Sequence, residues 1–384
     1  MKLNCSEINI YVFIRLSSDY CMSKIKVLII DDSALIRKVL TEILSADKEI
    51  EVVGTAPDPL IARDRIKQLN PDVLTLDVEM PKMDGITFLS NLMRLRPMPV
   101  VMVSTLTEAG ADVTLQALDL GAVDFLAKPK QDVNNNLSNY AFEICEKVKN
   151  AATVSRDVLA RQYERSSMRS LDKKHVLDAG HAKSIANSGF LNTTDKIIAI
   201  GSSTGGTEAV KELLLGLPSD VAGIVIAQHI PPVFSASFAR RLDEITSLNV
   251  SEARSGDQVR PGTVYVAPGD KHLRIRRSGA KYYCELDEGP EVNRHKPSVE
   301  VLFRSVAQCA GPNAMGIMLT GMGADGAQGM LEMKQQGSFN VAQDEKTSVV
   351  WGMPGSAVKL GAVEKVLPLN KIADEVIAYC KEQK

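Results

Sequence analysis

Short β-rich apolar runs alternate with segments of helical period along most of this 384-residue chain. In the first part of the chain the apolar runs are residues 27–30, 73–76, 100–103 and 123–126. The alternation returns in the second part, with expected strands at 197–200, 223–227, 314–320 and 340–342. Parallel strands joined by crossover helices produce this pattern, so the sequence predicts doubly wound α/β sheets.

Length and a change in composition predict two domains. The chain exceeds what one hydrophobic core usually serves. Residues 150–194 contain few large apolar side chains and mix Arg and Lys with acids, Ser, Asn and Ala, which indicates a linker. We therefore expect α/β domains at 22–149 and 195–384. Residues 1–21 belong to no motif, and Met22 is a more natural start, so they are an extension of no assigned function.

The stretch from about Ser251 to Glu285 differs from the rest of the second domain. It is rich in Gly, Val, Tyr and charge, which favours hairpins at a sheet edge over a crossover helix. The expected fold class is therefore α/β with two doubly wound domains. The first is flavodoxin-like, and the second is a Rossmann-like parallel sheet with an antiparallel hairpin region.

Composition excludes several classes of protein. The formal net charge is −2 and 45% of residues are hydrophobic, so no basic excess indicates nucleic-acid binding. The six cysteines form no C-x-x-C pair, which argues against a zinc site or a disulfide framework. No apolar run approaches the roughly 18 residues of a membrane helix. We expect a cytoplasmic protein without membrane insertion or a nucleic-acid partner.

Polar residues follow four predicted strands of the first domain: Asp31 and Asp32, Asp77, Ser104, and Lys128. The carboxyl ends of such strands meet in one crevice. Three carboxylates crowded there repel each other unless a hard cation joins them, and Mg²⁺ prefers oxygen ligands. The sequence predicts a Mg²⁺ site built from Asp31, Asp32 and Asp77, to which the backbone carbonyl of Glu79 could add a ligand.

A second candidate site begins with Ser203, in the run Gly201-Ser202-Ser203-Thr204-Gly205-Gly206. The run matches G-x-S-x-G between a predicted strand and helix, which is where a serine nucleophile is lifted above a sheet edge. The alternative is a glycine-rich turn that packs helix on strand or holds a phosphate at the helix N-terminus. From this segment alone the two interpretations are evenly balanced.

A nucleophilic serine needs a base. Of the five histidines, His229 ends the predicted strand 223–228 and shares a sheet edge with Ser203. His295 lies on a loop and is a weaker rival, while the remaining three fall in the linker or in a probable hairpin: His175, His181 and His272. Asp325, in a glycine-rich turn after the strand 314–320, is the candidate carboxylate that orients the base.

The backbone N–H groups of Thr204, Gly205 or Met322 are candidate oxyanion donors. Asp325 could alternatively serve as a helix N-cap, or do both. The order Ser, His, Asp along the chain differs from the Ser, Asp, His order of α/β-hydrolases, which disfavours that fold despite the motif.

The first domain resembles the receiver domain of two-component response regulators. The match covers about residues 24–145 and includes the segments "VLIIDDSALIRKVL", "DVLTLDVEMPKMDG", "VVMVST" and "FLAKPK". The resemblance implies that Asp77 accepts a phosphoryl group from a histidine kinase and that Ser104 and Lys128 sense its oxygens. It also implies Mg²⁺ at Asp31, Asp32 and Glu79, and a rotating aromatic side chain at Phe125.

The second domain resembles the catalytic domain of the chemotaxis protein-glutamate methylesterase family, usually called CheB. The matching segments are "IIAIGSSTGGTEAV", "AQHIPP", "NRHKPSVEVLF" and "IMLTGMGADGAQGM". The family's triad then falls on Ser203, His229 and Asp325. The implied reaction is hydrolysis of γ-glutamyl methyl esters on chemoreceptors, with glutamine deamidation in some members and no cofactor for the esterase step. The alternative is a response regulator whose second domain binds a ligand or partner without catalysis.

Overall fold

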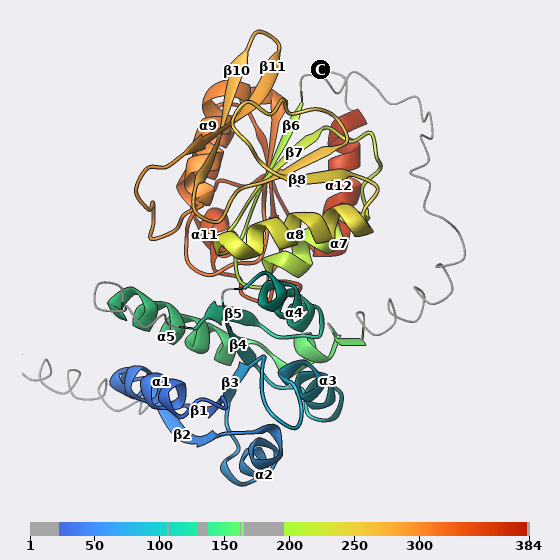
Figure 1. Cartoon of the computed structure of the whole chain (residues 1–384). Helices are drawn as coiled ribbons and strands as arrows, with labels where there is room; N and C mark the ends of the chain where they lie inside the picture. The colour runs from blue at the N-terminus through green and yellow to red at the C-terminus, as the bar shows by residue number, and fades with distance from the viewer. Residues whose placement is uncertain (1–22, 106, 129–136, 162, 165–195, 382–384) are drawn as a thin grey trace, which may run out of the picture.

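The computed structural model describes residues 23–105, 107–128, 137–161, 163–164 and 196–381. The extension 1–21 and most of the predicted linker lie outside the described residues. In the described part, two α/β units follow one another along the chain (Figure 1). No described helix is both long enough and apolar enough to cross a bilayer.

The first unit is a five-stranded parallel sheet in the order β2-β1-β3-β4-β5. Its strands are β1 (Ile25–Ile30), β2 (Ile50–Ala56), β3 (Val73–Asp77), β4 (Val100–Ser104) and β5 (Asp124–Ala127). Its helices are α1 (Ala34–Ala46), α2 (Pro59–Leu69), α3 (Gly85–Leu95), α4 (Glu108–Asp119) and α5 (Leu137–Thr153). Helices α1 and α5 pack together on one face of the sheet, with α3 and α4 on the other. The predicted flavodoxin-like fold is confirmed.

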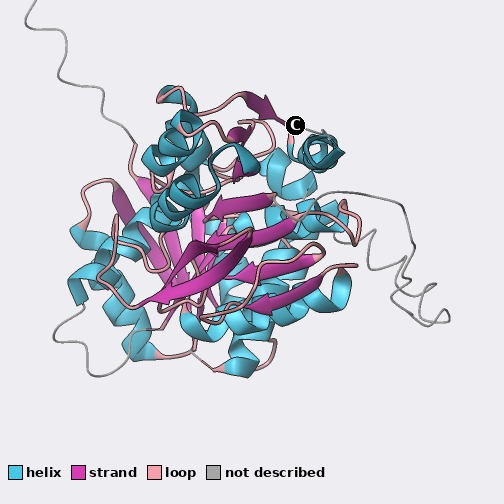
Figure 2. Cartoon of the chain, turned by 90° about the horizontal axis from the view of Figure 1, so that it is seen from above, coloured by secondary structure: helices cyan, strands magenta, loops and turns pink. Residues whose placement is uncertain are grey.

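The second unit is a seven-stranded sheet in the order β14-β13-β12-β6-β7-β9-β8, and every described pairing in it is parallel. Its strands are β6 (Ile197–Ser202), β7 (Gly223–Gln228), β8 (Asn249–Glu252), β9 (Thr263–Val266), β12 (Ala314–Met318), β13 (Phe339–Gln343) and β14 (Lys365–Leu367). Helices cover both of its faces: α7 (Gly206–Leu215), α8 (Pro232–Ile245), α9 (Val299–Ala310), α10 (Ala327–Gln335), α11 (Met353–Lys359) and α12 (Leu369–Lys381). Figure 2 shows this layered arrangement from above.

The stretch 251–285 is only partly a hairpin. Strands β10 (His272–Ser278) and β11 (Lys281–Asp287) form the expected antiparallel pair. Strands β8 and β9, however, run parallel to each other and belong to the main sheet. The connection between β8 and β9 contains no helix. Its Gly and charge content is therefore that of a hairpin turn, although the two strands that it joins are parallel. The predicted hairpin is confirmed for β10 and β11, whereas the prediction was wrong for β8 and β9.

Buried apolar strands explain why both sheets are covered on two sides. All six residues of β7 are buried, as are all five of β12, which is typical of parallel strands between helix layers. Helix α9 packs so closely against β6 that a Cβ added at Gly201 would lie 2.2 Å from Val299 Cγ1 and 3.2 Å from the Phe303 ring. Only glycine fits at position 201, where the strand approaches the Ser203 turn.

We expect Phe303→Ala to destabilise the second unit. Phe303 is fully buried, and the substitution removes a ring and leaves a cavity, which typically costs about 3–5 kcal/mol. The free energy of unfolding of the full chain, measured in urea, should fall by that amount. Leu215→Ala is the control: its side chain is 42% exposed, so its effect should be well under that of the core variant. Equal effects would contradict this packing.

Candidate active site and phosphoacceptor site

The Ser203 turn, His229 and Asp325 all lie at the carboxyl edge of the second sheet. Strand β6 ends at Ser202 and β7 at Gln228, so the next residue of each strand leaves the sheet at the same edge. The two segments are tied directly, because the His229 N–H donates to the Ser202 carbonyl at 3.1 Å. The Ser203 N–H donates to the Thr320 carbonyl at 3.1 Å, which links this turn to the end of β12.

Histidine 229 and aspartate 325 form a direct contact. The distance from His229 Nε2 to Asp325 Oδ2 is 2.9 Å, and both side chains are largely buried. The other ring nitrogen, His229 Nδ1, is buried and has no hydrogen-bond partner among the described residues. No hydrogen bond joins the Ser203 hydroxyl to His229 within the described part of the chain. His229 therefore has a carboxylate at one ring nitrogen and no described partner at the other, as a base in a catalytic triad would require.

The Asp325 carboxylate is supplied with several hydrogen-bond donors. Oδ1 accepts from Ser298 Oγ and from Asn293 Nδ2, both at 2.8 Å. Oδ2 accepts from the Val299 N–H at 2.7 Å, besides its contact with His229. Burial raises the pKa of Asp325, but the hydrogen bonds from His229, Asn293 and Ser298 outweigh it and hold this pKa below its ordinary value. Asp325 is therefore ionised at neutral pH and can stabilise a positive charge on His229.

Sequence reasoning missed Gln228, which holds the turn in place. Its Nε2 donates to the Ser203 carbonyl at 3.0 Å and to the His229 carbonyl at 3.1 Å. Its Oε1 accepts from Ser202 Oγ at 2.6 Å. A buried amide at the last position of an otherwise apolar strand is the signal that could have identified it, because a buried amide needs partners on both of its ends.

The structure places the two rival histidines together. The rings of His229 and His295 are stacked, with centroids 3.6 Å apart and planes 15° apart. His272 has a different role: its Nδ1 accepts from the Ser298 N–H at 3.1 Å, and Nε2 lies 2.9 Å from the Pro290 carbonyl oxygen. His175 and His181 lie outside the described residues. The geometry thus distinguishes His229, which pairs with a carboxylate, from His295, which covers one face of the His229 ring.

Thr204 and Met322, two of the candidate oxyanion residues, lie in the contact between the two units. Neither the Thr204 N–H nor the Met322 N–H donates a hydrogen bond to another described residue. The Thr204 hydroxyl is buried and donates to Asp124 Oδ2 in β5 of the first unit. The Met322 sulfur lies 2.6 Å from Asn150 Nδ2 in α5. Thr204 and Met322 therefore both contact the first unit.

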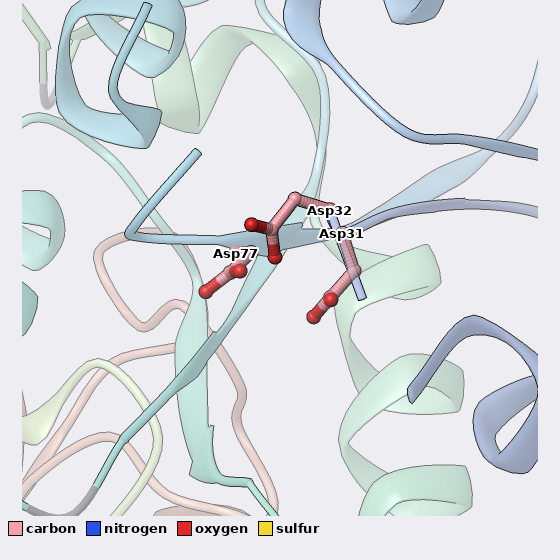
Figure 3. Close-up of side chains that lie close together, drawn as sticks. All are labelled: Asp31, Asp32 and Asp77. Carbon is pink, nitrogen blue, oxygen red and sulfur yellow. The ribbon is translucent and has the colours of Figure 1, made fainter. Parts of the chain in front are cut away.

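The acidic residues of the first unit form one cluster. Asp31, Asp32 and Asp77 each offer a carboxylate oxygen, and these oxygens all lie within 4.8 Å of one another (Figure 3). Lys128 Nζ lies 2.6 Å from Asp77 Oδ2 and 3.1 Å from Asp31 Oδ2. One lysine cannot neutralise three carboxylates, so the donor set fits a divalent cation with oxygen ligands.

Electrostatics at Asp77 reflect this crowding. Burial raises the pKa of Asp77 to about 6, with the Asp31 charge adding to the rise although Lys128 opposes it. The Glu79 N–H donates to Asp77 Oδ1 at 3.3 Å, which places this backbone segment beside the cluster. Ser104 is buried, and its hydroxyl donates to the Thr105 carbonyl at 3.4 Å rather than to the cluster.

Phe125 is buried in the contact between the two units. Its ring centroid lies 4.4 Å from that of Phe234 in α8, and only 6% of the residue is exposed. The side chain next to it in the chain, Asp124, contacts Lys147 of α5 at 2.8 Å and Thr204 beyond the interface. Strand β5 thus runs from the acidic cluster at Lys128 to the turn that carries Ser203.

A receiver-like sheet with an acidic crevice, joined to a parallel α/β unit with a histidine–carboxylate pair, defines a response regulator with a hydrolase-type output domain. The family models match accordingly: "Response regulator receiver domain" covers residues 27–137 and "CheB methylesterase" covers residues 198–376. A curated "Protein-glutamate methylesterase/protein-glutamine glutaminase" of Hydrogenovibrio crunogenus is 55% identical over 377 residues, covering 94% of this chain and 100% of that protein.

A protein of the same curated name from Nitrosomonas europaea is 53% identical over 361 residues, covering 93% of this chain and 97% of its own. Among solved structures, the CheB methylesterase catalytic domain of Thermotoga maritima is 39% identical, with a TM-score of 0.47, and covers 48% of this chain and 97% of that one. The chain belongs to the CheB methylesterase family that carries a receiver domain.

The raised pKa of Asp77 predicts how this residue affects stability. The folded state binds the proton more tightly than the unfolded state, so ionised Asp77 destabilises the fold increasingly as pH rises from about 4 to 6. One pKa unit corresponds to about 1.4 kcal/mol. At pH 7.5 without Mg²⁺, Asp77→Asn should therefore stabilise the protein by about 1–3 kcal/mol in thermal unfolding. The gain should vanish at pH 4, and a larger gain at pH 4 than at pH 7.5 would contradict the assignment.

Proposed function

We propose that this protein is a phosphorylation-regulated protein-glutamate methylesterase. It hydrolyses γ-glutamyl methyl esters on methyl-accepting chemoreceptors and releases glutamate and methanol. The observation that carries the proposal is the buried His229–Asp325 contact beside the Ser203 turn, in a chain whose curated relatives bear this enzyme name. These names do not favour the alternative of a non-catalytic binding module. They also include glutaminase activity, so glutamine deamidation is proposed as a second reaction at the same residues.

In the proposed reaction Ser203 Oγ attacks the ester carbonyl carbon while His229 Nδ1 takes the hydroxyl proton. His229 Nε2–H donates to Asp325, whose negative charge stabilises the imidazolium that forms. The N–H groups of Thr204 and Met322 are proposed donors to the oxyanion. The imidazolium returns the proton to the leaving methoxide, methanol departs, and water activated by His229 hydrolyses the acyl-enzyme. An amide substrate follows the same steps with ammonia as the leaving group.

In the first domain Asp77 is the proposed phosphoacceptor, with a histidine kinase as the phosphoryl donor. Asp31, Asp32, Asp77 and the Glu79 carbonyl would hold Mg²⁺, which when bound neutralises charge on the transferring phosphoryl group. Lys128 already contacts Asp77 and is placed to pair with a phosphoryl oxygen there. Ser104 lies at the end of the neighbouring strand and would reach that group only after its hydroxyl turns away from Thr105.

The contact between the domains supports inhibition of the unphosphorylated enzyme. Asp119 of α4 pairs with Lys211 and Arg241, and Arg240 lies 2.9 Å from Asp112 on the same helix. Together with the Asp124–Thr204 bond, these pairs hold the receiver over the residue that follows Ser203. We propose that phosphorylation of Asp77 loosens this contact through β5 and opens the site to the receptor.

Substitutions at the proposed triad test the reaction. Ser203→Ala and His229→Ala should each lower methanol release from methyl-labelled receptor membranes by orders of magnitude, while Asp325→Asn should cost less than either. The double variant Ser203→Ala with His229→Ala should lose little more than each single one, because residues of one catalytic unit are non-additive. Ser202→Ala is the neighbouring control. Wild-type turnover by folded Ser203→Ala would refute the proposal.

The interface predicts an effect of charge on basal activity. Asp119→Asn removes a carboxylate shared by Lys211 and Arg241, so it should weaken the closed arrangement and raise methanol release without a phosphoryl donor about tenfold. Asp64→Asn is the matched control, because it makes the same change at an exposed carboxylate of α2. Asp77→Asn should keep the basal rate and lose stimulation by acetyl phosphate with Mg²⁺. An unchanged basal rate in Asp119→Asn would argue for a receiver that only activates.

A further inference from the structure

The loop between β11 and α9 carries two residues that contact the His229–Asp325 pair. The backbone groups of Val292 and His295 pair in both directions, at 3.1 and 3.0 Å, and so close a tight turn. Its two central residues have positive φ angles, 53° at Asn293 and 67° at Arg294. Asparagine tolerates this region, whereas a side chain such as that of Arg294 is strained there and stays in it only where the surroundings enforce it.

The turn delivers one side chain to each member of the pair. Asn293 Nδ2 donates to Asp325 Oδ1 at 2.8 Å, while the His295 ring stacks on His229 with centroids 3.6 Å apart. Only one face of His229 can be covered in this way, and its edge remains directed to Asp325 through Nε2. Asp325 is further fixed by Ser298 at the end of the same loop and by the Val299 N–H at the start of α9.

The charges around His295 decide what its ring can do. His229 lies against its face, Asp325 is the nearby carboxylate, and Lys147 of α5 is the nearby cation. Burial, and then the neighbouring His229, lower the pKa of His295 to about 3, so the ring is neutral at physiological pH. A neutral ring can pack on an imidazole in either protonation state without competing for the Asp325 charge.

We propose that His295 is a positioning residue: its ring stacks on His229 and, with Asn293 on Asp325, fixes the plane in which His229 Nε2 faces Asp325 and Nδ1 remains free for the nucleophile. This inference rests on the proposed esterase function. In this role His295 transfers no proton, so it supports the His229 ring and does not compete with it as a base. A small rotation of the base would misalign it with the nucleophile, and misplacements of about 1 Å can cost about 100-fold in rate.

Two substitutions separate support from proton transfer. In the full chain phosphorylated with acetyl phosphate and Mg²⁺, His295→Phe keeps a flat ring and should retain kcat within about threefold. His295→Ala removes the ring and should lower kcat about 10- to 100-fold with KM unchanged. Glu291→Ala, an exposed residue of the same loop, is the control and should match the wild type. Equal, complete loss in both His295 variants would overturn the proposal, as would wild-type kcat in His295→Ala.

A readout without substrate keeps this test separate from the proposed function. In the wild-type full chain, proton NMR should show a downfield imidazole N–H signal from His229 Nε2 hydrogen-bonded to Asp325. The signal should persist in His295→Phe and broaden or disappear in His295→Ala, while His229→Ala identifies it. A signal unchanged in His295→Ala would refute a positioning role. By contrast, an inactive wild type with this signal present would refute the esterase function alone.

Discussion

The buried carboxylate of Asp325 is the group around which the carboxyl edge of the second domain is organised. An ionised carboxylate without partners is very costly to bury, so the fold must supply donors from several segments. It does so with His229 beyond the end of β7, with Asn293 and Ser298 from the loop before α9, and with the Val299 N–H at the start of α9. Three distant parts of the chain are therefore fixed relative to one another by one side chain.

The receiver handles buried charge in a different way. Among the described residues, Lys128 is the cation that forms ion pairs with the receiver's cluster of Asp31, Asp32 and Asp77, and burial keeps the Asp77 pKa high. Asp325 is stabilised in its charged form within the chain, whereas the receiver cluster retains negative charge that the proposed Mg²⁺ would balance. Incomplete neutralisation of the carboxylates suits a site that changes state, because binding of a cation then changes the electrostatic energy of the site most.

The two domains contact each other through β5, which lies between the acidic cluster of the receiver and the Ser203 turn. Strand β5 carries Asp124, whose carboxylate contacts Lys147 in its own domain and Thr204 next to Ser203. Phe125 packs on Phe234 of α8, and Asn150 of α5 contacts Met322. A shift of β5 or α5 within the receiver would therefore change contacts at Thr204 and Met322, which would give the proposed phosphorylation of Asp77 a short physical route to the candidate active site.

The sequence alone determined the fold class, the family and which residue types gather at each sheet edge, because strand runs and the residues that follow them are local signals. Only the tertiary structure decided that β8 and β9 pair in parallel, since hydrogen-bonding direction depends on partners distant in sequence. It also decided that the His295 ring covers His229, and that Gln228 ties the Ser203 carbonyl to the His229 carbonyl. These contacts depend on side chains meeting across separate loops, and such distances are set by packing and not by local pattern.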